Sequence, residues 1–146
     1  MKLRSIFALI ATDALDDARD FYVRYLGFIV AFETEWYVQL HGYRDEGDTP
    51  LEIAFMRPKN DSIPPSLQQA FDGRGVFITV ELDDVDPLYE RLRADGFEFV
   101  IDLRDEPWGQ RHFMVRDPSG GLLDVVRPIA PTEDYQSAYV DDVATD

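Results

Sequence analysis

An internal repeat constrains the fold of this 146-residue chain more than any other feature of its sequence. Residues 6–28 resemble residues 76–97, and each copy starts with an apolar run that reads as a strand. An aspartate follows the run, Asp13 in one copy and Asp83 with Asp84 in the other. We expect it to cap a helix that ends at a glycine, so the repeat predicts two copies of one small module.

Three strand-like runs follow each of the two predicted helices, about 15–25 and about 87–94. The sequence therefore predicts an α+β fold of two tandem βαβββ modules, whose curved mixed sheet encloses a cavity. The expected strands after the helices are 28–32, 36–41 and 51–56 in the first half, and 97–102, 110–116 and 122–126 in the second.

Turn signals and composition set the expected boundaries. We expect one domain over residues 1–130, with module one at about 4–57, a linker at about 58–74 and module two at about 75–128. Residues 131–146 form an acidic tail to which the sequence assigns no element.

Alternation within the strands divides each sheet into two faces, since successive side chains of a strand point to opposite sides. One face is aliphatic and is expected to pack against the helices: Ile6, Ala8, Ile10, Val76, Ile78, Val80, Ile53, Phe55, Leu123 and Val125. The other face mixes aromatic, small and acidic residues, as the lining of a ligand cavity does.

Composition excludes several classes of function. Cysteine is absent, which excludes disulfides and thiolate chemistry and suits a cytoplasmic protein. The apolar run near the N-terminus is interrupted at Thr12 and Asp13, and no run reaches the roughly 20 apolar residues of a membrane span. The net charge of −15 argues against nucleic acid and membrane partners, and it favours either simple solubility or attraction of cationic small molecules.

Two segments resemble motifs of the vicinal oxygen chelate superfamily, which includes glyoxalases, dioxygenases and bleomycin resistance proteins. Residues 21–28 (FYVRYLGF) resemble its "FY-x-x-x-LGF" segment. Residues 107–120 (PWGQRHFMVRDPSG) resemble the "PWG…RDP-x-G" segment of its bleomycin-resistance-like branch. Together with the repeat, the resemblance covers about residues 4–127.

In metal-dependent members of this superfamily, the first and last strand of each half supply the metal ligands. Carried over by position, the resemblance places those sites at Phe7, Glu52, Phe77 and Asp124. A phenyl ring donates no lone pair, and two carboxylates alone make a poor transition-metal site. We therefore expect no metal site and no cofactor.

Catalysis remains an alternative, with Glu52, Asp124 and His112 as candidates. The two carboxylates form an acid–base pair if burial raises their pKa values, or else they are paired with Arg111, Arg116 or Arg127. The histidines, His41 and His112, lie outside the expected ligand positions and are read as polar residues of the sheet.

Aromatic residues near the expected cavity suit a planar or cationic ligand. The predicted ligand-binding residues are Phe7, Trp36, Glu52, Phe77, Trp108, Arg111, Phe113 and Asp124. Together with the resemblance, they favour a metal-independent protein that binds and sequesters an aromatic or cationic compound, as in antibiotic resistance. The alternative is a glyoxalase-like lyase or isomerase. Members of the family usually pair, so we also expect a homodimer.

Overall fold

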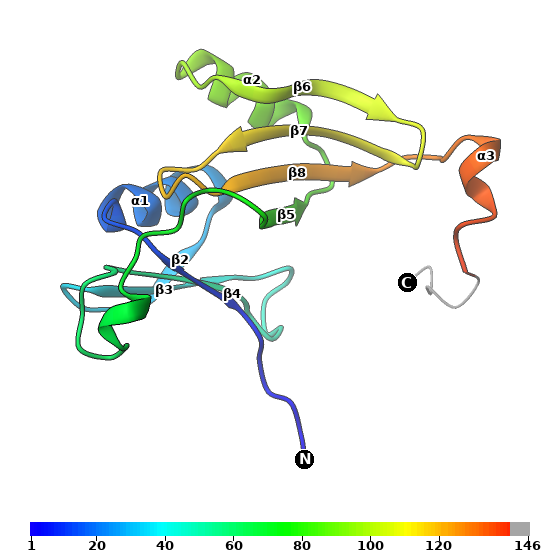
Figure 1. Ribbon diagram of the computed structural model, residues 1–146. Coiled ribbons are helices and arrows are strands. Elements are labelled where there is room, and N and C mark those ends of the chain that lie inside the picture. The colour runs from blue at the N-terminus through cyan, green and yellow to red at the C-terminus, as the bar shows by residue number, and fades with distance from the viewer. Residues whose placement is uncertain (141–146) are drawn as a thin grey trace. The chain divides into compact units, whose positions relative to one another are not determined.

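The computed structural model describes residues 1–140, which form two βαβββ modules in tandem (Figure 1). The last residues of the acidic tail, 141–146, lie outside the described part of the chain. The first module comprises β1 (Ala8–Ala11), α1 (Leu15–Leu26), β2 (Ile29–Glu33), β3 (Tyr37–Gly42) and β4 (Leu51–Met56). After the short 3-10 helix η1 (Pro65–Leu67), the second comprises β5 (Phe77–Glu81), α2 (Asp86–Ala94), β6 (Phe99–Glu106), β7 (Gln110–Arg116) and β8 (Leu122–Pro128). A last helix, α3, spans Glu133–Gln136.

Each module forms its own four-stranded mixed sheet, in the orders β1-β4-β3-β2 and β5-β8-β7-β6. The first strand of each module lies at an edge of its sheet and pairs in parallel with the last strand, with Leu9 beside Ala54 and Thr79 beside Asp124. The other pairs are antiparallel. The predicted pair of βαβββ modules is therefore confirmed.

The chain divides into two compact units. The first contains residues 1–76 together with the β7–β8 turn, Asp117–Gly121. In this unit α1 packs on one face of the first sheet, because its apolar stripe of Ala18, Phe21 and Tyr22 is buried. On β3, the side chains that face α1 are buried and alternate with half-buried ones on the opposite face, as the period of two predicts.

The second unit has a core between α2 and its sheet. Leu88 and Leu92 are the buried residues of α2. The ring of Tyr89 on the same helix lies 4.5 Å from that of Phe99 and 5.5 Å from that of Phe113. Helix α2 therefore covers one face of β6 and β7, and the opposite face of these strands is not in contact with Tyr89.

Asp13 and Asp83 do not cap the helices as expected. Helix α1 begins at Leu15 with Ala14 at the cap position, and the Thr12 hydroxyl accepts the hydrogen bond from the Ala14 amide. Before α2, the Asp84 carboxylate accepts from the Asp86 amide at 3.1 Å. The expected glycine at the end of α1 is confirmed, since Gly27 adopts the left-handed conformation there (φ 68°).

The segment after β8 is tied to the β6–β7 turn. The amides of Ile129 and Thr132 donate to the carbonyls of Gly109 and Pro107, each at 2.9 Å. The Tyr139 hydroxyl donates to the carbonyl of Trp108. The start of the acidic tail is thus ordered by backbone hydrogen bonds, which composition alone does not reveal.

No helix within residues 1–140 is both long and apolar enough to cross a membrane.

Candidate functional site

The face of the first sheet opposite α1, here called the sheet-one face, brings together polar residues from two strands. Tyr37, Gln39 and His41 alternate along β3 and point to this face, and Glu52 of β4 is paired with His41 in the strand register. Sequence alternation predicted that Glu52 lies on this face.

Three donors hold the carboxylate of Glu52. The Ser5 hydroxyl donates to Oε2, while the Gln39 amide (2.6 Å) and His41 Nε2 (3.1 Å) donate to Oε1. The side chain of Glu52 is 11% exposed. The polar centre of the sheet-one face is therefore a hydrogen-bonded carboxylate.

These donors lower the pKa of Glu52, with the Ser5 hydroxyl as the largest cause and the Gln39 amide and His41 adding to it. Partial burial opposes the shift and is outweighed. Burial, with the charge of Glu52 as a further cause, raises the pKa of Tyr37. The raised carboxylate pKa considered from the sequence is therefore wrong for Glu52, because hydrogen-bond donors, not apolar side chains, surround its oxygens.

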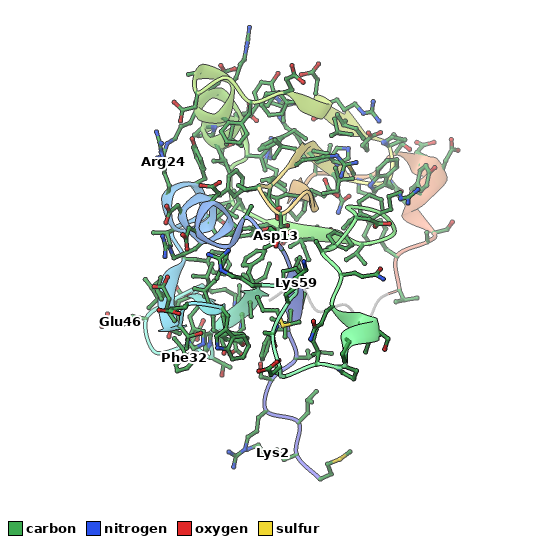
Figure 2. The ribbon with its side chains drawn as sticks, turned by 60° about the vertical axis from the view of Figure 1, so that its left-hand side comes forward. Lys2, Asp13, Arg24, Phe32, Glu46 and Lys59 are labelled. Atoms are coloured by element: carbon green, nitrogen blue, oxygen red, sulfur yellow. The ribbon has the colours of Figure 1, made fainter. Side chains whose placement is uncertain are left out.

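Exposed apolar side chains flank this polar centre on both edge strands. Leu9 of β1 is 45% exposed, and Phe7 precedes that strand at 39% exposure. On the other edge, Phe32 of β2 (Figure 2) is 57% exposed, and its ring lies 6.0 Å from that of Tyr37. Trp36, predicted as a ligand-binding residue, lies before β3 with its ring 5.8 Å from Tyr37.

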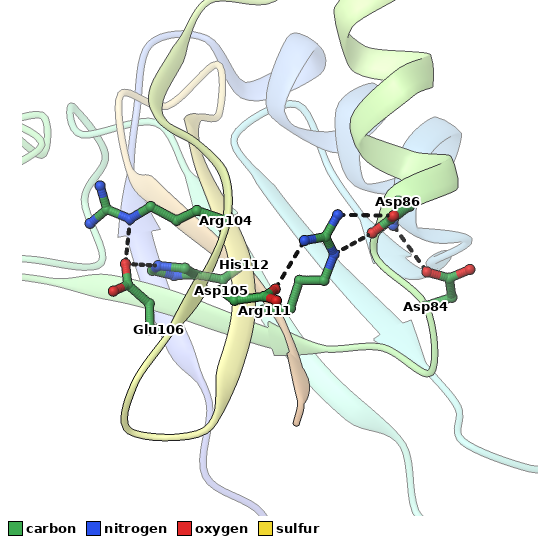
Figure 3. A network of polar contacts seen from close by, with 7 residues as sticks. All are labelled: Asp84, Asp86, Arg104, Asp105, Glu106, Arg111 and His112. Carbon is green, nitrogen blue, oxygen red and sulfur yellow. Dashed lines mark hydrogen bonds and ion pairs between the residues drawn. The ribbon is translucent and has the colours of Figure 1, made fainter. Parts of the chain in front are cut away.

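The corresponding face of the second sheet, opposite α2 and here called the sheet-two face, carries an ionic cluster (Figure 3). His112 of β7 lies between two carboxylates, with Nδ1 2.7 Å from Asp124 and Nε2 2.9 Å from Glu106. Arg104 of β6 donates to Glu106. The side chain of His112 is 3% exposed, so the ring is inaccessible from solvent.

Hydrogen bonding connects the members of this cluster. Each ring nitrogen of His112 faces a carboxylate oxygen, and Glu106 Oε1 also accepts from Arg104. Contacts from His112 and Arg104 lower the pKa of Glu106, in keeping with this pairing.

Two predicted ligand-binding residues lie on the opposite side of the second sheet. Phe113 is fully buried, and its ring packs on Phe99 and Tyr89 beneath α2. Arg111 makes a bidentate contact with Asp86 at the start of α2, at 2.8 and 3.1 Å, and a further bond with Asp105 at 2.9 Å (Figure 3). Both residues therefore stabilise the contact between helix and sheet.

Phe77 and Trp108 lie elsewhere in the second unit. Phe77 starts β5 with 59% of its surface exposed, and the strand alternation puts it on the sheet-two face, two residues before Thr79, which pairs with Asp124. Trp108 in the β6–β7 turn is 37% exposed; its indole N–H donates to Gln110 at 2.8 Å, and its ring lies 6.1 Å from that of His112.

The expected metal positions do not fit a transition-metal site in either unit. Phe7 and Phe77 offer no donor, the Glu52 oxygens accept from Ser5, Gln39 and His41, and Asp124 is bound to His112. Glu106 and Asp124 contact different nitrogens of one ring, so they diverge around it. Within residues 1–140, no group of three or more metal-ligating side chains converges.

Sequence reasoning missed Ser5, Gln39, Glu106 and Arg104. The alternation of side chains could have predicted Gln39 on this face, because Gln39 lies two residues from both Tyr37 and His41 on a predicted strand. Glu106 was not, because β6 extends four residues beyond its predicted end at residue 102.

Comparisons with known proteins agree with this architecture. A family model described as "Glyoxalase/Bleomycin resistance protein/Dioxygenase superfamily" matches residues 5–125. No curated protein sequence matches the chain.

Several solved structures share the fold. A glyoxalase/bleomycin resistance protein/dioxygenase from Nocardioides is 24% identical over 88% of this chain and 87% of its own, with a TM-score of 0.65. A lactoylglutathione lyase from Agrobacterium tumefaciens is 21% identical over 84% and 92%, with a TM-score of 0.64. TnmS3, an antibiotic binding protein from Streptomyces sp. CB03234, is 22% identical over 88% and 98%, with a TM-score of 0.62. At these identities the likeness shows the fold alone.

Proposed function

Because the chain belongs to the glyoxalase/bleomycin resistance protein/dioxygenase superfamily, we propose that it binds a small aromatic or cationic molecule without a metal ion. Its role is to sequester that molecule, as a member of the bleomycin-resistance-like branch. TnmS3, which shares the fold, is an antibiotic binding protein, and this makes aromatic antibiotics one class of ligand to test.

One observation carries the proposal: phenylalanine occupies two of the four positions at which the family resemblance places metal ligands, and both rings are exposed. Phe7 and Phe77 retain 39% and 59% of their accessible surface. Large apolar side chains left exposed beside polar groups are typical of surfaces that bind another molecule. An exposed aromatic ring provides an area on which a planar molecule can stack. Coordination of a metal ion does not need such an area.

The alternative, a lyase or isomerase, finds less support in the geometry. A general acid or base needs a nitrogen or oxygen within reach of the substrate proton. Both nitrogens of His112 already contact carboxylates in a buried position, and Asp124 is engaged by the same ring. Glu52 is held by three donors that favour its ionised form. The candidate acid–base groups are therefore already engaged by partners within the protein.

Ligand titration followed by tryptophan fluorescence tests the proposal, because Trp36 and Trp108 are the only tryptophans and lie in different units. A panel of planar compounds, cationic and neutral, should include one that changes the emission saturably. The same compound should raise the unfolding temperature as its concentration increases. The variants Trp36→Phe and Trp108→Phe then show which unit reports the binding.

Substitution of the exposed rings provides the control. Phe7→Ala or Phe77→Ala should weaken binding of the compound by about tenfold or more, as the loss of an aromatic residue that contacts a ligand does. Leu67→Ala removes a side chain that is 66% exposed in η1, outside the strands of both sheets and outside the predicted ligand-binding set, and should leave binding unchanged. If no compound binds, or if the Leu67 variant loses as much affinity as both phenylalanine variants, the proposal is wrong.

A further inference from the structure

The two sheet faces differ in the partners of their central carboxylates. On the sheet-two face, the two nitrogens of His112 contact the carboxylates of Asp124 and Glu106, and the Arg104 guanidinium donates to Glu106. On the sheet-one face, two of the three donors to Glu52 are the uncharged hydroxyl of Ser5 and the uncharged amide of Gln39. A neutral donor stabilises a carboxylate without cancelling its charge.

The third donor to Glu52, His41, has only one carboxylate beside its ring. His41 Nε2 faces Glu52, while Nδ1 lies 3.5 Å from the hydroxyl of Tyr43. His41 therefore differs from His112, both of whose nitrogens face carboxylates.

Apolar surface surrounds this charge on the sheet-one face. Phe32 and Tyr37 present rings on the side of β2, and Leu9 lies exposed on β1. A carboxylate next to aromatic rings attracts an organic cation in two ways, by direct attraction and by cation–π contact.

We propose that the sheet-one face recognises the cationic part of the ligand, with Glu52 as the charge partner and Phe32 and Tyr37 as the aromatic contacts. This rests on the proposed small-molecule function and goes beyond it by assigning the cation to one unit and one carboxylate. Ser5 is the donor that such a ligand displaces, because it lies in the exposed N-terminal segment, whereas Gln39 and His41 are held in β3.

The test compares two probes of similar shape, 1-methylquinolinium and quinoline, near neutral pH, where only the first is charged. Isothermal titration of the wild-type chain should give about tenfold tighter binding of the cation, the ratio that corresponds to about 1.4 kcal/mol. Glu52→Gln should make the two affinities equal. Added salt should reduce the wild-type preference and leave the binding of quinoline unchanged.

Two further variants separate charge recognition from folding. Ser5→Ala keeps the Glu52 charge and frees Oε2, so it should bind the cation at least as tightly as the wild-type chain does. Glu81→Gln removes a different exposed carboxylate, on β5 of the other unit, and should keep the preference for the cation. Thermal unfolding of each variant confirms that it is folded before titration.

The outcomes distinguish this inference from the proposed function. If the wild-type chain binds both probes equally, it binds small molecules without recognising the cation. That result overturns the inference and leaves the proposed function standing. So does a preference that survives Glu52→Gln, or one that Asp124→Asn or Glu81→Gln abolishes. Absence of binding by either probe removes the inference for this class of ligand; the proposed function fails only if the wider panel of planar compounds fails as well.

Discussion

A buried hydrogen bond between Tyr22 and Asp117 offers the sharpest test of the packing in the first unit. Tyr22 is fully buried on α1, and its hydroxyl donates to Asp117 Oδ2 at 2.6 Å. The other oxygen, Oδ1, accepts from the amides of Ser119 (2.8 Å) and Gly121 (3.2 Å) and from the Ser119 hydroxyl. Asp117 is 4% exposed, so water cannot replace a lost donor without structural change.

The variant Tyr22→Phe removes this donor and keeps the ring, which packs against Phe28 and Phe55. The carboxylate oxygen is then buried without its partner, and loss of a hydrogen bond to a charged group costs about 1.5–3 kcal/mol. With a denaturant dependence of about 2 kcal/mol per molar, the urea midpoint should fall by roughly 1 M. Circular dichroism and the fluorescence of Trp36, in the same unit, measure it.

Tyr89→Phe is the matched control, because Tyr89 also donates to an aspartate, Asp102, but at 3.1 Å and in an exposed position. That bond competes with water, so its loss should cost at most about 1 kcal/mol. If Tyr22→Phe proves no more costly than Tyr89→Phe, the Asp117 carboxylate does not depend on Tyr22, and the account of this turn is wrong.

Alkaline pH provides a second measurement on the same pair. Burial, with the charge of Asp117 as a further cause, raises the pKa of Tyr22. The unfolded chain loses this proton near pH ~10, whereas the folded chain keeps it, so unfolding releases a proton above that pH. The contribution of Tyr22 is therefore complete below pH ~10 and declines by about 1.4 kcal/mol per pH unit above it. The stability gap between the wild-type chain and Tyr22→Phe should narrow accordingly; a gap constant across that range would contradict the assignment.

Three further predictions concern other parts of the molecule. Gly109→Ala should destabilise the protein by about 1–3 kcal/mol in thermal unfolding, because Gly109 has φ 108° and an added Cβ would lie 2.8 Å from the Tyr139 hydroxyl and 3.0 Å from the Ile129 carbonyl. Gly47→Ala, at φ 89° with nothing within 4 Å of the added carbon, should cost less, and equal costs would contradict the close packing. Elemental analysis of purified protein should find no stoichiometric transition metal; about one metal per chain, lost on replacement of Glu52, would refute this. Light scattering should give the mass of a homodimer, and a monomer mass throughout the micromolar range would count against pairing.

The modules and the faces of their strands were predictable because both depend on local periodicity. A repeat fixes the order of the elements, and a period of two assigns each strand residue to a face. Leu51–Met56 and Gln110–Arg116 match their predicted bounds, and Phe55 and Val125 are buried as the aliphatic face requires. The same rule separates two of the predicted site residues, which are neighbours on one strand. His112, a catalytic candidate, lies on the sheet-two face, and Phe113, a predicted ligand-binding residue, lies on the face that packs beneath α2.

The hydrogen-bond partners were not predictable, because they depend on register and on strand length. Register shifts interrupt the pairing of β6 with β7, and the strand continues to Glu106, which brings that carboxylate to His112. Ser5 reaches Glu52 across 47 positions of sequence. Local propensity carries no information about either contact, since each arises only once the sheet has formed.

Because Phe7 and Phe77 cannot ligate a metal ion, the carboxylates of Glu52 and Asp124 need another source of stabilisation. A bound metal ion offsets the charge of the carboxylates that ligate it. Where no metal ion is bound, a partly buried carboxylate needs either an opposite charge or hydrogen-bond donors to remain ionised. Asp124 contacts a ring nitrogen of His112, whereas Glu52 is held chiefly by the uncharged donors Ser5 and Gln39. An uncharged donor stabilises a carboxylate without cancelling its charge. It follows that the first unit, although built on the same module as the second, keeps a carboxylate charge with which a ligand can interact.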